Sequence, residues 1–301
     1  MEWVIFALIG PLFWTVSNFL DKYAVEKVTT GVADYAFWGG IGAIFVVTLI
    51  PVFFDINIPE TWLLILIMSA GFLLSYVFML YGHIVSHTDV SRVVPIFQLR
   101  TIMVFVAGAL FFGEVMNAGQ TLGLFVAIAG TLVLSLDFAQ MKKPKLNRWT
   151  LYAVVGTAGF AIIILINDLA VENLDIPSIM FIFDIGYLLA AASYLLRKSW
   201  RKEIFEGIRT ATWRKAGLFA INDISDELGQ LFSKLAFVGA PAAALVPAVQ
   251  GIQAFYAVIA GLAITVWFPH ITKEDISKRM LLQKCAGAAI IIVGIMLVQL
   301  S

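Results

Sequence analysis

Charged and polar side chains recur at helical spacing inside an otherwise apolar stretch, between residues 216 and 238. Counted from Asp223, the spacings are three, four, seven and eleven residues, and they lead to Asp226, Glu227, Gln230 and Lys234. At 100° per residue these side chains form one ridge of an α-helix. Carboxylates held this close together do not all stay ionised, so the ridge could exchange a proton or hold a cationic solute. Alternatively, the acids pair with Lys234 and with cations of other helices for structure alone.

The composition indicates that this helix lies in a membrane. Of the 301 residues, 61% are hydrophobic and 13% are charged, and the mean hydropathy is +0.93. Soluble domains average about 45–50% apolar and roughly 25% charged residues. Charged side chains are costly in lipid and nearly always face a bundle interior or a watery cavity, so the ridge predicts a functional site.

Apolar runs long enough to cross a bilayer of roughly 30 Å recur along the chain. We therefore predict an all-α integral membrane protein whose helices are surrounded by lipid, with one membrane domain over residues 1–301. The connections are short and leave no room for a soluble domain. The ten expected spans are 2–20, 32–54, 61–82, 90–112, 118–137, 150–168, 177–196, 216–238, 241–267 and 281–300.

The two halves of the chain, residues 1–138 and 149–301, share motifs in the same order. The matching pairs are Pro95 and Gln98 with Pro247 and Gln250, and Gly123 and Gly130 with Gly287 and Gly294. Because each half holds five expected spans, the second copy must enter the membrane upside down. The sequence thus predicts two five-helix repeats of inverted topology, an arrangement in which the substrate site of a secondary transporter lies near the midplane between the halves.

The basic residues predict the orientation. The odd-numbered loops are those that join span one to two, three to four, five to six, seven to eight and nine to ten. Of the 20 Lys and Arg, all but Arg100 and Lys234 lie on the side of these loops. By the positive-inside rule, these loops are cytoplasmic and both termini face outward. We expect a multi-pass protein of the cell membrane.

These features resemble a known family. The segment from Val94 to Arg100 opens the fourth span, Gly113 and Glu114 close it, and Gly123 and Gly130 follow in the fifth. Together with the two inverted five-span repeats, they resemble the EamA-like branch of the drug/metabolite transporter superfamily over essentially the whole chain. The resemblance implies an exporter or exchanger of small metabolites, amino acids or drugs. It also implies a central cavity lined by spans one to four and six to nine.

Asp184 is isolated in the middle of the seventh span and needs a partner there. We predict that Arg100, an unattached cation in the fourth span, faces it. The pair is either a structural bridge or one that separates when substrate binds, because a retained buried pair says little about function by itself. Lys234, near the end of its span, is expected to reach the interface and to mark the outer end of the helix.

Further polar residues of the spans are expected to line the same cavity, although the glutamines could instead join helices, as polar side chains often do in membranes. We predict kinks at the two prolines, where a backbone hydrogen bond is missing. The glycines of the fifth and tenth spans are expected to allow close helix packing. The expected lining residues are Gln98, Gln250, Gln253, Asn18 and Tyr76, and the kinks are expected at Pro95 and Pro247.

The sequence lacks the residues that several other classes of function require. The formal net charge is zero, which argues against a nucleic-acid partner. The sequence holds no zinc-protease, serine-hydrolase or P-loop motif, so we expect no cofactor, no resident metal and no enzyme activity. We predict a secondary active transporter of a small organic solute, an exporter that is proton-coupled or of the exchange type and works by alternating access, for which a monomer is sufficient. The alternatives are a membrane-embedded lipid-modifying enzyme and a passive channel.

Overall fold

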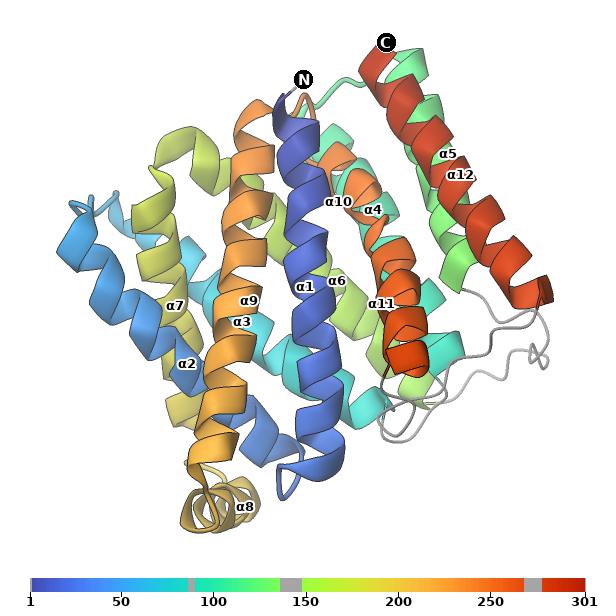
Figure 1. The fold of residues 1–301 in the computed structure, drawn as a ribbon. Helices are drawn as coiled ribbons and strands as arrows, with labels where there is room; N and C mark the ends of the chain where they lie inside the picture. Colours follow the sequence, from blue (N-terminus) through green and yellow to red (C-terminus); the bar gives the residue numbers. More distant parts are fainter. Residues whose placement is uncertain (1, 86–89, 136–147, 268–277, 301) are drawn as a thin grey trace.

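A computed structural model describes residues 2–85, 90–135, 148–267 and 278–300, and every regular element in these ranges is a helix (Figure 1). The helices are α1 (Glu2–Lys27), α2 (Val32–Phe53), α3 (Thr61–Val85), α4 (Val90–Ala107), the π-helical turn η1 (Gly108–Phe112), α5 (Ala118–Ser135), α6 (Arg148–Asn173), α7 (Ile176–Tyr194), α8 (Lys198–Arg209), α9 (Trp213–Gly239), α10 (Leu245–Gln250), α11 (Gln253–Trp267) and α12 (Lys278–Leu300).

Each expected span coincides with one of these helices or with two consecutive ones, but three boundaries differ. Helices α1 and α6 run on to Lys27 and Asn173, well past the predicted ends at residues 20 and 168. The ninth span is not one continuous helix, because α10 ends at Gln250 and α11 begins at Gln253. The interruption therefore falls four residues after Pro247 and not at the proline itself.

The connection between the seventh and eighth expected spans holds a further helix, which the sequence analysis did not predict. Residues 198–209 form α8, which places Ile204 in a buried apolar cluster while its basic residues Arg201 and Lys202 stay exposed. An apolar stripe opposite a charged face is the pattern of a helix that lies on a surface. In Figure 1, α8 lies across the end of the bundle opposite to both chain termini.

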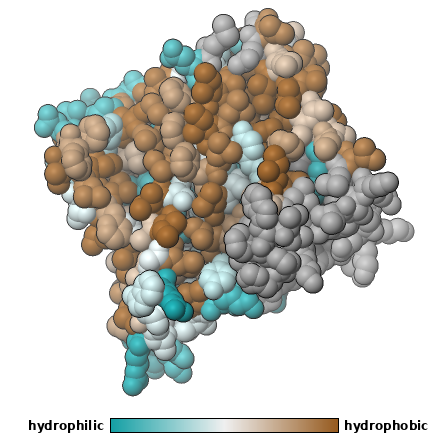
Figure 2. All heavy atoms as spheres, in the orientation of Figure 1, coloured by the Kyte–Doolittle hydropathy of each residue, from teal (hydrophilic) through white to brown (hydrophobic). Residues whose placement is uncertain are grey.

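Several helices are suited to a membrane. Within the described residues, α1, α2, α3, α6 and α7 are long and apolar enough to cross one, and shorter apolar helices accompany them. Figure 2 shows hydrophobic side chains over most of the visible face, with hydrophilic ones gathered toward opposite ends. Helix α9 is not among the five because it carries the charged ridge. It is held instead by extensive packing against α1 and by further contacts with α2, α6 and α7.

The helices pack in a few dominant pairs. Helix α1 packs along α9, α3 packs against both α6 and α7, and α4 packs against α6. Helices α5 and α12 form a separate, closely packed pair at one edge of the bundle (Figure 1).

Glycines permit the closest of these approaches. A Cβ atom on Gly71 of α3 would overlap the carbonyl oxygen of Phe183 in α7, and one on Gly186 of α7 would overlap the carbonyl oxygen of Met68 in α3. The pair α5 and α12 is joined in the same way, and the close packing expected at the glycines of these two helices is thus confirmed. A Cβ on Gly123 would lie 2.7 Å from the oxygen of Gly294, and one on Gly130 would lie 2.8 Å from the oxygen of Gly287.

We predict that Gly71→Ala lowers the free energy of unfolding by about 1–3 kcal/mol, because the added methyl group meets backbone that can move only with the whole of α7. Denaturation of the purified protein in detergent measures this. The matched control is Gly217→Ala in α9, where a Cβ would have no neighbour within 4 Å and where alanine is the better helix former by about 1 kcal/mol. A Gly71→Ala variant as stable as the control would contradict the close packing of α3 on α7.

Candidate functional site

A small cavity lies in the interior of the bundle, among α1, α2, α3, α7 and α9. Its volume is about 40 Å³, enough for roughly three water molecules. The residues that line it are Ser17, Asp21, Tyr35, Ala36, Gly39, Ala43, Leu74, Phe78, Phe183, Asp184, Tyr187, Asn222, Asp223, Asp226, Glu227 and Gln230.

The structure brings the predicted ridge of α9 into this cavity. Asp223, Asp226, Glu227 and Gln230 all line it, and Asp184 reaches it from α7. Asp184 lies beside Glu227, and Asp226 lies beside Gln230. The carboxylate of Asp223 is pressed against α2, where a Cβ on Gly42 would overlap it. One face of α9 thus presents three carboxylates to a space too small for bulk water.

Lys234 lies deep in the protein, and the prediction that it marks the outer end of its helix was wrong. Its side chain is 1% exposed, and its ammonium group lies 5.0 Å from the centre of the Phe183 ring. Helix α9 continues to Gly239, so Lys234 is a full turn inside the helix. It lies close enough to interact electrostatically with Glu227, Asp184 and Asp226. The ammonium therefore offsets part of the negative charge of the cavity.

Asp184 consequently has a partner other than the predicted one. Its charged neighbours are Lys234 and the acids of α9. The guanidinium of Arg100 lies 5.6 Å from the centre of the Phe160 ring, and its Nε atom has no hydrogen-bond partner. Asp184 therefore lies near Lys234 and not near Arg100, because α7 contacts α9 while α4 packs against α6.

Helix α1 contributes Asp21 and Ser17, whereas the predicted Asn18 is exposed. Residues four apart share a helix face, and the residue after Ser17 is turned away by about 100°. Asp21 lies just past the predicted end of the first span at residue 20, but α1 continues for six residues beyond it. Its Oδ1 atom accepts a hydrogen bond of 2.7 Å from Nδ2 of Asn222.

The other predicted lining residues lie elsewhere or cannot be placed. The amide of Gln250 donates to Ser233 Oγ at 2.9 Å and so joins α10 to α9. The hydroxyl of Tyr76 shares a hydrogen bond of 2.7 Å with Ser193. Gln253 is at the start of α11, and it is not among the residues that line the cavity. Helix α4 runs through Pro95 and Gln98, but their side chains lie outside the described residues.

Glu114 lies at the end of η1, away from the cavity, and joins two loops. Its Oε2 atom accepts a hydrogen bond of 3.2 Å from the backbone N–H of Ala243. Partial burial raises the pKa of Glu114 above its ordinary value, the hydrogen bond from Ala243 opposes this, and the negative charge of Glu172 adds to it. Glu114 therefore has a local partner in the loop before α10.

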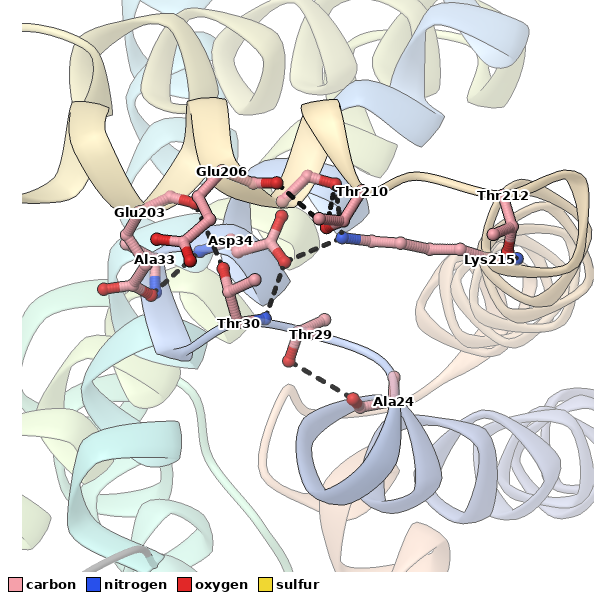
Figure 3. A network of polar contacts seen from close by, with 11 residues as sticks. Ala24, Thr29, Thr30, Ala33, Asp34, Glu203, Glu206, Thr210, Thr212 and Lys215 are labelled. Carbon is pink, nitrogen blue, oxygen red and sulfur yellow. Dashed lines mark hydrogen bonds and ion pairs between the residues drawn. The ribbon is translucent and has the colours of Figure 1, made fainter.

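A second charged group, which the sequence analysis missed, lies where α2, α8 and α9 meet (Figure 3). Asp34 and Lys215 form an ion pair of 2.7 Å, and their side chains are 0% and 4% exposed. Asp34 Oδ2 also accepts from the N–H of Thr30 at 2.9 Å, and Lys215 Nζ also donates to the carbonyl of Gly207 at 3.2 Å. We refer to Asp34 and Lys215 as the α2–α9 ion pair.

Helix α8 supports the α2–α9 ion pair from the side. Glu203 Oε1 accepts hydrogen bonds from the backbone N–H groups of Ala33 and Asp34, at 2.7 and 3.2 Å. Such groups in the first turn of a helix have no partner within the helix, so Glu203 caps α2 from another helix. Gly207 allows Asp34 to lie against α8, because a Cβ there would overlap the carboxylate.

Aromatic rings lie between the α2–α9 ion pair and the cavity. The ammonium of Lys215 is 5.0 Å from the centre of the Trp38 ring, and this ring stacks on Phe219 at 5.8 Å. Phe219 also contacts Tyr35, which lines the cavity. Lys215, Phe219 and Asp223 follow one another at intervals of four residues, so the pair lies about 12 Å from Asp223 along α9. The charged pair and the rings thus lie at the α8 side of the cavity.

The sequence holds only a weak signal for this pair. Asp34 and Lys215 stand at the edges of their spans, where charged residues usually meet water. Only the contact between α2 and α9 shows that each buries its charge against the other. In the described residues, no group of three or more His, Cys, Asp or Glu side chains is placed to hold a metal ion.

We predict that Lys215→Met destabilises the protein by about 3–5 kcal/mol, because it leaves Asp34 buried without a counter-charge. The double variant Asp34→Asn with Lys215→Met removes both charges and should recover most of this loss. Lys202→Met, at an exposed position of α8, is the control and should leave the free energy of unfolding unchanged. The expected coupling is refuted if the double variant is no more stable than Lys215→Met alone.

Comparison with known proteins agrees with this architecture. Residues 1–136 match the model of the EamA-like transporter family. A solved crystal structure is similar over 99% of this chain and 97% of that chain, with a TM-score of 0.63 and 13% sequence identity, a likeness of fold alone. No curated protein matches the chain. Residues 1–136 of this multi-pass membrane protein are thus similar to the EamA-like transporter family, the family that the sequence resembled.

Proposed function

We propose that the protein is a secondary active transporter of a small organic solute and that the cavity among α1, α2, α3, α7 and α9 is its substrate site. The transporter is proton-coupled or of the exchange type and works by alternating access. The family resemblance favours export. The observation that carries the proposal is the meeting of five carboxylates at one buried cavity, those of Asp21, Asp184, Asp223, Asp226 and Glu227.

Acidic side chains inside a membrane are expensive and mark ion, proton or substrate pathways. Near the cavity, the described residues place one buried ammonium, that of Lys234, against these five acids. The remaining negative charge must be met by bound protons or by a cationic ligand. A carrier in which the two compete can couple the movement of one to that of the other.

The packing supports an arrangement as two inverted repeats with ten membrane-spanning helices. In the two halves, α1 corresponds to α6, α2 to α7, α3 to α9 and α5 to α12. Exchanging the halves therefore turns the contact of α1 with α9 into that of α6 with α3, and leaves the contacts of α2 with α7 and of α5 with α12 unchanged. All four of these contacts are extensive in the structure. Gly123 and Gly130 correspond to Gly287 and Gly294. The exchange therefore turns the contact of Gly123 with Gly294 into that of Gly287 with Gly130, and both are present. This reciprocity is expected for a two-fold axis in the membrane plane.

In the proposed transport cycle, the α2–α9 ion pair stabilises a conformation that is closed on the α8 side. It joins α2 to α9 at the end of the cavity nearest α8, with the rings of Trp38 and Phe219 beneath it. Opening on this side requires the ammonium of Lys215 to leave Asp34. Because water can then solvate both groups, the separation costs far less than removing one partner from the closed structure.

A passive channel and a lipid-modifying enzyme remain the competing functions. A channel needs a continuous path, whereas the cavity is small and the buried α2–α9 ion pair joins two of its helices on the α8 side. These observations favour a carrier.

We predict that Asp223→Asn and Glu227→Gln each lower coupled transport at least about tenfold, equivalent to ~1.4 kcal/mol, while the protein still folds. Proteoliposomes preloaded with a mixture of amines, amino acids, carboxylates and sugars, under an imposed pH gradient, measure this by mass spectrometry of the solutes that cross. Asp55→Asn is the matched control, because Asp55 is an exposed acid outside the cavity.

Three results would overturn the assignment. Wild-type flux in both cavity variants would remove these acids from the pathway. Flux that does not saturate and does not respond to pH would indicate a channel. Turnover of lipid without movement of any solute would indicate an enzyme.

We further propose that α8 is cytoplasmic and that the loop between α2 and α3 faces outward. In a Cys285→Ser background, Asp55→Cys should react with an impermeant maleimide on intact cells. Lys202→Cys should react only after the cells are permeabilised. Both positions are exposed in the structure, so the opposite result would reverse the orientation.

A further inference from the structure

The charges around the cavity are unevenly compensated. Lys234 lies near Asp184, Glu227 and Asp226. Asp21 and Asp223, by contrast, have no Lys, Arg or His within ion-pair distance in the described part of the chain. The cavity thus has one part with a built-in cation and one part without. We refer to the second part, formed by Asp21, Asn222 and Asp223, as the uncompensated end.

Asn222 supplies a second, independent observation at this end. Its Nδ2 atom donates to Asp21 at 2.7 Å, so the Oδ1 atom of the same amide is left to accept a hydrogen bond from another group. Its Oδ1 atom is buried and has no hydrogen-bond partner. Water does not readily supply one, because Asn222 is only 7% exposed. A buried acceptor without a donor costs about 1–3 kcal/mol. The uncompensated end therefore offers three sets of acceptor oxygens. Asp21 accepts hydrogen bonds from Asn222 and Tyr35, whereas the amide oxygen of Asn222 has no donor.

Such a site is complementary to a group that carries positive charge and several N–H donors. We propose that the uncompensated end binds the ammonium group of a small protonated amine, held by Asp21, Asp223 and the amide oxygen of Asn222. This names the substrate class of the transport site and so rests on the proposed function. An ammonium group is close to a water molecule in size and fits a cavity of about 40 Å³.

The surrounding walls favour an organic cation over a metal ion. The rings of Tyr35, Phe183 and Tyr187 line the same cavity, and aromatic faces attract ammonium groups and the methylene groups attached to them. In the described residues, no three His, Cys, Asp or Glu side chains converge closely enough to hold a metal ion. The carboxylates therefore suit a hydrogen-bonded cation better than a coordinated one.

Binding of ethanolamine to the purified full-length protein tests the proposal, with ethylene glycol as the neutral probe. The two molecules have the same number of heavy atoms, and the second replaces the ammonium group by a hydroxyl. Ionic strength is held constant with sodium chloride. Affinity is measured by calorimetry and by the rise in unfolding temperature, since a ligand that binds only the folded state stabilises it.

We expect saturable binding of ethanolamine and at least tenfold weaker binding of ethylene glycol. Asp223→Asn, which keeps the shape of the side chain, should weaken ethanolamine binding at least tenfold. Asn222→Leu should do the same by removing the amide oxygen. The exposed-acid control Asp55→Asn should leave the affinity unchanged.

The proposal is overturned if ethanolamine does not bind or binds no better than ethylene glycol. It is also overturned if Asp55→Asn weakens binding as much as Asp223→Asn, because the amine would then associate with exposed acids. Should Asn222→Leu fail to fold, Asp223→Asn alone decides.

The outcome is separable from that of the transport experiment. Movement of a different solute that depends on Asp223, without ethanolamine binding, would refute the amine and leave the transporter. Ethanolamine binding that depends on Asp223, with no solute crossing the bilayer, would keep the site and refute the transporter.

Discussion

The arrangement of the bundle depends on how the carboxylates of α9 are kept away from lipid. An isolated ionised carboxylate in an apolar medium is so unfavourable that it loses its charge or finds a partner. Helix α9 therefore needs neighbours along its whole polar ridge. It has them in α1, which packs along its length, and in α2 and α7, which complete the cavity. The same requirement explains why Lys234 is buried beside Glu227 and Asp184, because one internal cation reduces the charge that the cavity must hold.

Glycine contacts fix the framework around this charged centre. Gly71 and Gly186 bring the backbones of α3 and α7 into contact beside the cavity, and four glycines join α5 to α12 at the edge of the bundle. Backbone against backbone leaves no side chain to adapt, so these interfaces have one well-defined spacing. The interface of α2 with α9 is different, since it is held by the α2–α9 ion pair and by the carboxylate of Asp223 against Gly42.

The sequence predicts the helices well because lipid imposes their length and their apolar character on each segment separately. Periodicity likewise places Asp223, Asp226 and Glu227 on one face, and the glycines of the fifth and tenth spans predict close packing, although not that α5 and α12 pack on each other. What fails depends on contacts between helices. Asp34 and Lys215 look like loop charges until α2 meets α9, and Asp184 could be paired with any cation until the packing of α7 brings it to Lys234. The amphipathic α8 was missed because a short polar segment was taken for a loop.

The two polar contacts between α2 and α9 connect the proposed substrate site with the α8 side of the cavity. Lys215 and Asp223 are eight residues apart on α9, and their contacts on α2, Asp34 and Gly42, are also eight residues apart. A movement of α9 along or away from α2 therefore disturbs both contacts together. If a cation bound at Asp223 draws this carboxylate away from Gly42, the same displacement acts on the α2–α9 ion pair two turns away. Occupancy of the cavity and opening of the α8 side would then be coupled through one rigid helix, without any longer chain of side-chain contacts.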